Sequence, residues 1–286
     1  MVEEYKYLGV TVSSTGDLFG KHKRSKELGM LRMLGMLKSV SNKIADSYSM
    51  IRELWKGVGV PRSLYGYEVF KVNKEEMDRM EKIQNKIARL ALGGNKYTAV
   101  EALRGEMGWS RYHERIVKMK ANYKLRLEQM GQRNEGSWAA YIYRVVGLDW
   151  VKEINRIDRK YLLRDLYFEE NGRKLVEDAI CLFGQTEWER GLNTKSTLRF
   201  YGNKERPMME EYYDGSYQGK LLYRARSGSL EVNGRTYRWN GGRENCQNCV
   251  EMVKETIEHV IIECDRYEVE RRDLMQEILN QVGQER

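Results

Sequence analysis

The chain has 286 residues, with 50 lysines and arginines against 42 aspartates and glutamates, and a sequence pI near 9.1. This balance predicts a polyanionic partner, with nucleic acid ahead of a membrane surface, although a basic soluble protein without such a partner has the same composition. Four cysteines are too few for a disulfide framework, no apolar run reaches the ~18 residues of a membrane span, and the N-terminus lacks the order of a signal peptide. We therefore expect a nuclear or cytoplasmic protein in a reducing compartment, with no membrane partner.

Residues 5–12 are rich in aromatic and β-branched side chains, which predicts a strand that ends at the turn residues 13–16. An edge strand normally pairs with another strand, and no candidate precedes this one in the sequence. Residues 1–16 are therefore interpreted as the last strand of a truncated domain.

Residues 18–56 are predicted to form a helix, followed by a break and a turn at 57–72. One face is basic, because residues 18–43 hold seven lysines and arginines against one glutamate. Such a face can follow a phosphate backbone or can simply be solvated. The apolar stripe at three-to-four spacing is Leu28, Leu31, Leu34, Leu37, Val40 and Ile44, and the candidate nucleic-acid contacts are Lys21, Lys23, Arg24, Lys26 and Arg32.

Three more helices complete a predicted helical bundle over residues 17–131. Asn73 and Glu76 form a capping box, and Gly93 ends that helix. Thr98 and Glu101 repeat the cap signal for a short helix that ends at Gly108. The third helix ends at Gly131, with Ile116, Met119, Tyr123, Leu127 and Met130 on one face and Lys118, Lys120, Lys124 and Arg126 on the other.

Residues 132–219 are predicted to be a helical connector with weaker patterning. Residues 131–150 contain Gly and Ser and are expected to link, 151–200 are expected to be helical, and 201–219 are expected to be a loop. Cys181 lies on an expected apolar face, which favours a small buried core residue.

Residues 220–243 are basic again and contain a hairpin signal, with Asn233-Gly234 as its two-residue turn. Aromatic residues among these arginines favour stacking on bases beside phosphate contacts, although the same residues can instead pack a small metal module. The candidate contacts are Arg224, Arg226, Arg235, Arg238 and Arg243, and the aromatic residues are Tyr223, Tyr237 and Trp239.

Cys246, Cys249, His259 and Cys264 have the spacing of a closed, structural Cys3His zinc site. The alternative is a set of ordinary thiols with a surface histidine. All four positions are protein ligands, so such a site leaves no open position for a catalytic water. The segment from 244 onward is acidic, so we expect its final helix to pack on the module or on a partner, away from nucleic acid. Residues 220–286 are thus predicted to form a basic hairpin, a zinc knuckle and a C-terminal helix.

Several catalytic patterns are absent from the sequence. It has no adjacent Asp-Asp pair, no phosphate-binding loop of the GxxxxGK[ST] type and no GxSxG motif. Two-metal phosphoryl transfer needs converging acidic ligands, and the scattered carboxylates nominate no such set. We therefore expect no catalytic residues and no enzyme activity of this chain on its own.

The order of its blocks resembles the C-terminal part of the reverse transcriptase polyprotein of LINE-like non-LTR retrotransposons. The blocks are Tyr7-Leu8-Gly9-Val10, Leu64-Tyr65-Gly66-Tyr67-Glu68-Val69-Phe70, the Met77–Leu92 helix with Gln84 and Arg89, Ala102-Leu103-Arg104-Gly105-Glu106-Met107-Gly108, and the Cys/His segment with Glu255-Thr256-Ile257-Glu258-His259 and Glu263-Cys264. The resemblance covers nearly the whole chain and is weakest over 131–220.

The resemblance implies a mainly α fold with an end-of-palm strand, a thumb-like helical bundle and a zinc knuckle. It implies that Tyr7, Leu8 and Gly9 match the primer grip and that the partners are RNA or DNA. A reverse transcriptase palm, in cis or in trans, is a further implied partner. The palm with its paired aspartates would lie before Met1. Two alternatives remain open: a zinc-stapled helical adaptor for proteins, and a decayed element without function.

Overall fold

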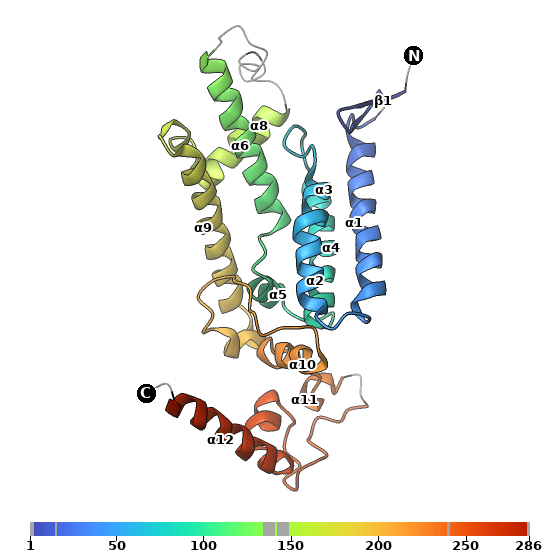
Figure 1. The fold of residues 1–286 in the computed structure, drawn as a ribbon, viewed down its shortest axis with the longest axis vertical. Coiled ribbons are helices and arrows are strands. Elements are labelled where there is room, and N and C mark those ends of the chain that lie inside the picture. The colour runs from blue at the N-terminus through green and yellow to red at the C-terminus, as the bar shows by residue number, and fades with distance from the viewer. Residues whose placement is uncertain (1–2, 15, 134–140, 142–148, 239–240, 285–286) are drawn as a thin grey trace.

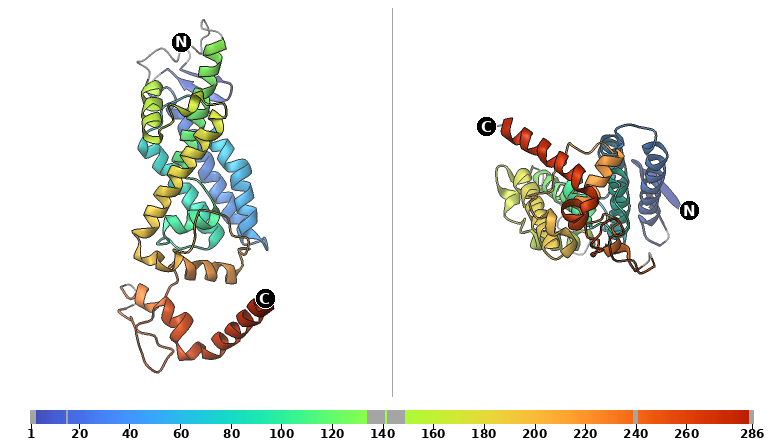
Figure 2. Two further views of the ribbon diagram at one scale, coloured as in Figure 1. Left: turned by 90° about the vertical axis from the view of Figure 1, so that its left-hand side faces the viewer. Right: turned by 90° about the horizontal axis from the view of Figure 1, so that it is seen from below.

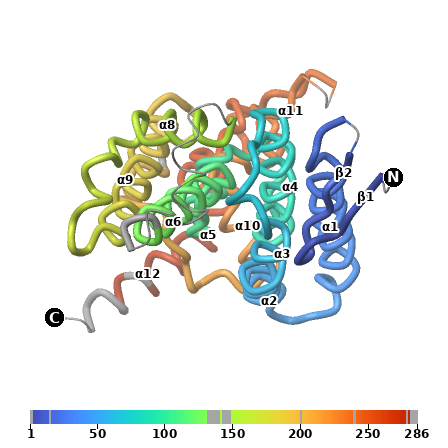
Figure 3. Tube along the Cα trace, turned by 90° about the horizontal axis from the view of Figure 1, so that it is seen from above, coloured from blue at the N-terminus to red at the C-terminus, as the bar shows by residue number. Residues whose placement is uncertain are grey.

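The computed structural model describes residues 3–14, 16–133, 141, 149–238 and 241–284, and it is mainly helical. The N-terminal hairpin and the C-terminal helix α12 lie at opposite ends of an elongated molecule (Figure 1). The four longest helices of the upper part, α1, α4, α6 and α9, follow one another across the bundle when it is seen from above (Figure 3). The expected link at 131–150 lies mostly outside the described residues.

The N-terminal segment is a hairpin, so the prediction of one unpaired strand over residues 5–12 was wrong. β1 (Glu4–Tyr7) pairs antiparallel with β2 (Val10–Ser13). Leu8 and Gly9 form the turn, with φ of 45° and 82°. Positive φ at both central residues is the turn geometry that matches the twist of a tight hairpin. The strand therefore finds its partner within the next few residues of the chain.

The expected helix over 18–56 is divided. α1 (Gly20–Ser41) is followed by α2 (Ser47–Leu54), the π-helical turn η1 (Trp55–Gly59) and α3 (Val60–Leu64). The side chain of Asp46 accepts from the backbone N–H of Ser49 and so caps α2. The predicted stripe of α1 was half wrong, because this helix contacts its neighbours on one side only. Of its members, Leu34 and Leu37 are buried and Val40 is half-buried, whereas Leu28, Leu31 and Ile44, the last of which lies beyond α1, are exposed.

The capping box of the next helix is confirmed. α4 (Lys74–Leu92) begins with reciprocal hydrogen bonds between Asn73 and Glu76 and ends at Gly93, whose φ is 68°. α5 (Val100–Met107) ends at Gly108 in the same left-handed conformation. The predicted cap at Thr98 was wrong, because Ala99 precedes the helix and the Thr98 hydroxyl bonds to Asn95 instead.

Two lysines of the basic face of α6 (Tyr112–Arg133) have partners on another helix, which the sequence did not indicate. Lys120 and Lys124 are buried, and each binds a carboxylate of α8 (Asp149–Tyr161). Their Nζ atoms lie 2.5 Å from Glu153 Oε2 and 2.5 Å from Asp158 Oδ2. This face of α6 can hold buried lysines because α8 supplies the carboxylates that bind them.

α9 (Gly172–Asn193) packs on α6 and follows the 3-10 turn η2 (Leu166–Phe168). The buried positions of α9 recur every fourth residue: Val176, Ile180, Gly184, Trp188 and Leu192. Cys181 lies just outside this row and is exposed, so the prediction of a buried core cysteine was wrong. η3 (Ser196–Tyr201) then leads into irregular chain over 202–216, so the loop expected over 201–219 is confirmed except at its ends, where η3 ends and a helix begins at Tyr217.

The C-terminal part contains α10 (Tyr217–Arg226), the short helix α11 (Asn233–Thr236), the turns η4 (His259–Glu263) and η5 (Asp265–Tyr267), and α12 (Glu268–Gln284). The hairpin predicted around Asn233-Gly234 was wrong. The backbone N–H of Asn233 donates to the Glu255 carboxylate at 2.8 Å, and that of Gly234 donates to the Glu255 carbonyl at 2.9 Å. This tertiary partner satisfies the first N–H groups of a helical turn, which the local sequence did not indicate. The left view of Figure 2 shows this part below the bundle.

Candidate metal centre

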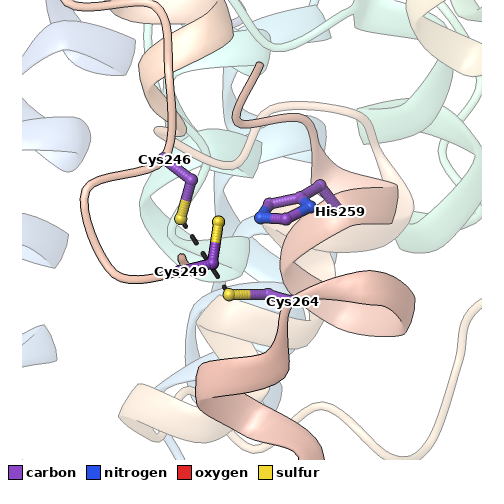
Figure 4. A group of neighbouring side chains, drawn as sticks. All are labelled: Cys246, Cys249, His259 and Cys264. Atoms are coloured by element: carbon purple, nitrogen blue, oxygen red, sulfur yellow. Dashed lines mark hydrogen bonds between the residues drawn. The ribbon is translucent and has the colours of Figure 1, made fainter. Parts of the chain in front are cut away.

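Two short segments present the Cys/His side chains to one another. Cys246 directly follows an isolated antiparallel bridge between Asn245 and Lys254, and its backbone N–H donates to the Val253 carbonyl at 2.7 Å. This bridge folds the Cys246–Cys249 turn back on itself. His259 begins the π-helical turn η4 and Cys264 follows its end. The three sulfurs and the imidazole ring consequently face one common space (Figure 4).

The donor atoms are close enough to hold one metal ion. One ligand atom from each of the four residues lies within 4.8 Å of all the others. The Sγ atoms of Cys246 and Cys264 are 3.9 Å apart, and the cysteines are free thiols. Two sulfurs bound tetrahedrally to one zinc at ~2.3 Å lie about 3.8 Å apart, so this separation is compatible with zinc.

Burial argues against the alternative of a surface histidine. Cys246 and Cys264 are 0% exposed and His259 is 3% exposed. Neither ring nitrogen of His259 has a hydrogen-bond partner in the described part of the chain, and Nδ1 lies 3.7 Å from Glu263 Oε2. A buried polar nitrogen without a partner costs about 1–3 kcal/mol, and coordination of a metal would remove that cost. The donor set therefore fits a metal ion.

The electrostatic setting requires a positive charge if the thiols are to ionise. Burial is the main cause that raises the pKa of the Cys246 thiol to about 11. The backbone N–H of Asn248, at 3.4 Å from the Cys246 sulfur, acts in the opposite direction by favouring the thiolate. A bound metal ion deprotonates a coordinating thiol outright, so it would supply the charge that the site lacks.

Side chains around the site fix its two halves. The Arg271 guanidinium donates to the carbonyl oxygens of Cys264, at 2.8 Å, and Ile261, at 3.3 Å. Glu258 forms an ion pair with Arg199 of η3. The centre is thus tied to α12 on one side and to the helical bundle on the other.

Tyr7, Leu8 and Gly9, which the resemblance matches to a primer grip, lie at the exposed tip of the N-terminal hairpin. Tyr7 is the last residue of β1, and Leu8 and Gly9 are the turn. The Tyr65 hydroxyl donates to the Leu8 carbonyl, which ties this tip to the segment after α3. Two blocks of the resemblance, residues 7–10 and 64–70, are therefore neighbours in space.

The five candidate residues of α1 differ in their surroundings. Lys23 is buried, with its Nζ 3.1 Å from Asp17 and 3.3 Å from Glu76, so it is part of the fold. Lys21 pairs with Glu4 of β1, and the Nζ of Lys26 lies 5.0 Å from the centre of the Tyr65 ring. Arg24 and Arg32 are exposed on α1.

The five candidate arginines of 220–243 also divide into two groups. Arg224 donates to the Gly93 carbonyl at 2.7 Å, Arg226 pairs with the buried Glu106 at 3.3 Å, and Arg235 donates to the Gly228 carbonyl. Arg238 and Arg243 are exposed. Of the expected stacking residues, Tyr223 is buried, Tyr237 is half-buried and Trp239 lies outside the described residues.

Two further cations, Lys6 and Arg62, act on Lys26 of α1, although the sequence pattern does not reveal them. Burial, then Arg62, then Lys6 lower the pKa of Lys26. Lys6 lies on β1 and Arg62 on α3, so the three are far apart along the chain and no local periodicity connects them. Tertiary packing alone brings these like charges together.

No protein-family model, no curated protein and no solved structure matches this chain. Within the described residues, no helix is both long enough and apolar enough to span a membrane.

Proposed function

We propose that this chain is a nucleic-acid-binding C-terminal fragment of a LINE-like reverse transcriptase, in which a zinc knuckle adjoins a thumb-like helical bundle. The observation that carries the proposal is the buried Cys246, Cys249, His259 and Cys264 cluster, whose donor atoms lie within 4.8 Å of one another. It stands at the position where the resemblance implies a knuckle. RNA or DNA would be held mainly through phosphate contacts, and a palm in cis or in trans is the implied protein partner.

Zinc is the metal that we propose for the cluster. Three thiolates and one imidazole are a preferred ligand set for zinc, and four protein ligands close the coordination sphere. The ion would have a structural role, because metal binding to such a module is coupled to its folding. Its chemistry would be to neutralise the thiolates and to join η4 to the Cys246–Cys249 turn.

The proposed nucleic-acid contacts are the exposed cations. Arg24 and Arg32 of α1, with Arg238 and Arg243 of the segment that precedes the cluster in the sequence, are exposed. Arg224, Arg226 and Arg235 bind groups of the protein itself, so we propose a structural role for them. The sequence has no adjacent Asp-Asp pair, and we propose no polymerase activity for this chain alone.

Fluorescence anisotropy with labelled single-stranded RNA and with a primer–template duplex tests the proposal. We expect binding at ~50 mM salt that weakens steeply as salt rises, because phosphate contacts release counterions. Arg24→Ala combined with Arg32→Ala is expected to lower the affinity. Leu182→Ala, at an exposed position of α9 distant in sequence from these cations, serves as the control. Absence of binding at low salt, or binding indifferent to salt, would contradict the proposal.

A second candidate function, an adaptor for other proteins, is favoured by exposed apolar side chains in the C-terminal part. Val250, Ile262 and Val269 are among the most exposed of these. Pull-down of a protein partner that survives nuclease treatment, together with failure to bind any nucleic acid, would favour this function.

A further inference from the structure

A groove between α1 and the η1–α3 segment combines an apolar floor with unpaired positive charge. Its volume is about 500 Å³, within the range of sites that bind other molecules. The apolar lining consists of Met30, Met33, Met36, Leu54 and Val58. The three methionines recur at three-residue spacing along α1, and flexible thioether side chains adapt to an incoming apolar surface.

The charged side chains of this groove are all cationic. Lys26, Arg32 and Arg62 line it, and no carboxylate is within ion-pair distance of any of them in the described chain. A second groove, between α1 and α4, differs in this respect, because Glu76 and Glu27 line it and pair with Lys23 and Arg79. The α1–α3 groove therefore selects a ligand that is both apolar and acidic.

Such a ligand exists in the chain itself. In α12, Leu274, Met275 and Leu279 are 54%, 52% and 66% exposed, so their apolar surface is uncovered. Glu270 and Glu277 lie seven residues apart, on the side of the helix next to Leu274. Neither glutamate has an ion-pair partner in the part of α12 that the structure describes. α12 packs chiefly on the turns η4 and η5 that precede it.

The two surfaces agree in length as well as in charge. At 1.5 Å per helical residue, Met30 to Met36 spans about 9 Å and Leu274 to Leu279 about 8 Å. α12 lies at the far end of the long axis from the hairpin, beyond α10 and α11 (Figure 1). In this arrangement its apolar face does not cover the α1–α3 groove of its own chain.

We propose that α12 of a second copy of this chain occupies the groove between α1 and α3, and that two such contacts form a reciprocal dimer. An amphipathic helix that lays its apolar face into a hydrophobic groove is a recurring recognition mode, and charges at the rim set its orientation. The methionine floor favours this occupant over nucleic acid, since apolar area gains nothing from a phosphate backbone. The inference does not depend on the proposed binding of RNA or DNA.

The test is a charge reversal measured by sedimentation velocity on nuclease-treated full-length protein with its metal retained. A groove variant carries Arg32→Glu and Arg62→Glu, and a helix variant carries Glu270→Lys and Glu277→Lys. We expect the wild-type chain to form dimers and each variant alone to be monomeric. A mixture of the two variants should recover the dimer, because both of its contacts then pair opposite charges.

Replacement of apolar residues of α12 provides an independent test. Leu274→Asp combined with Leu279→Asp is expected to weaken the dimer at least tenfold. Leu182→Asp on α9, whose side chain has the same 66% exposure as that of Leu279, should leave it unchanged. A wild-type chain that stays monomeric at all concentrations overturns the proposal. So does a dimer that nuclease abolishes, or a variant mixture that does not associate. A loss of RNA binding in the groove variant concerns the proposed function and leaves these outcomes unaffected.

Discussion

The pair formed by Lys120 and Glu153 gives the most quantitative test of how the connector is joined to the bundle. Lys120 is 0% exposed, and its Nζ lies 2.7 Å from the Phe70 carbonyl and 2.5 Å from Glu153 Oε2. Burial lowers the pKa of Lys120, and Glu153 is the main influence in the opposite direction. Glu153→Ala would leave a buried ammonium with only a carbonyl to accept from it.

Removing one partner of a buried pair typically costs 3–5 kcal/mol, because the remaining charge stays uncompensated. We expect Glu153→Ala to lower the free energy of unfolding by about 3 kcal/mol, near the bottom of that range, since the Phe70 carbonyl remains as an acceptor. The double variant Lys120→Met with Glu153→Leu should lie within about 1 kcal/mol of the wild-type chain, because no buried charge remains.

Urea denaturation followed by circular dichroism measures these differences. The matched control is Glu268→Ala, which removes an exposed pair with Arg272 and should cost no more than about 0.5 kcal/mol. If Glu153→Ala also cost less than about 1 kcal/mol, Lys120 would not be a buried charge that depends on α8, and the arrangement of α6 and α8 described above would be refuted.

The remaining predictions concern pH, the metal and the exposed cations. Burial lowers the pKa of His113 to about 4, so its neutral form stabilises the fold above the ordinary pKa of 6.5. That contribution, about 3 kcal/mol, should be lost as pH falls from 6.5 to 4, and the difference in unfolding free energy between wild type and His113→Gln should show this pH dependence; a difference independent of pH would contradict it. Cys249→Ser should lower metal retention and raise hydrogen exchange over 244–268 while leaving α4 protected. An equal rise of hydrogen exchange in α4 and in 244–268 would show that 244–268 is not a separate metal-dependent unit. Arg24→Ala should reduce the salt dependence of RNA binding by about one phosphate contact without changing the melting temperature, whereas Arg235→Ala should lower the melting temperature. An equal effect of both on binding alone would refute the division between exposed and structural arginines.

Local chemistry made part of the fold predictable. Asn73, Glu76 and Gly93 define α4 because a capping box and a left-handed glycine act within a few residues of the helix end. The Cys/His cluster was predictable for a similar reason, since ligand spacing along the chain constrains which side chains can meet. These features need no distant partner.

The wrong predictions share a cause in tertiary contacts. Asn233-Gly234 signals a hairpin in isolation, but Glu255 captures both N–H groups and a helical turn results. The sequence also did not indicate that Lys120 is buried, because its partner Glu153 lies on another helix. Cys181 was expected to be buried, yet the row that α9 buries passes through Ile180 instead.

The candidate nucleic-acid contacts were also only partly predictable from the sequence. The sequence nominated the cations of α1, but it could not separate the buried Lys23 from the exposed Arg32. It did not nominate Arg62 at all, because α3 approaches Lys26 only in the folded chain. Charge runs therefore indicate a surface, whereas the folded chain decides which side chains remain available on it.

The zinc content of the purified chain tests the central claim most directly. After purification under reducing conditions without added metal, elemental analysis should find one zinc per chain, held by Cys246, Cys249, His259 and Cys264. A chain that is folded yet contains no zinc, and that takes up none when zinc is supplied, would contradict the account.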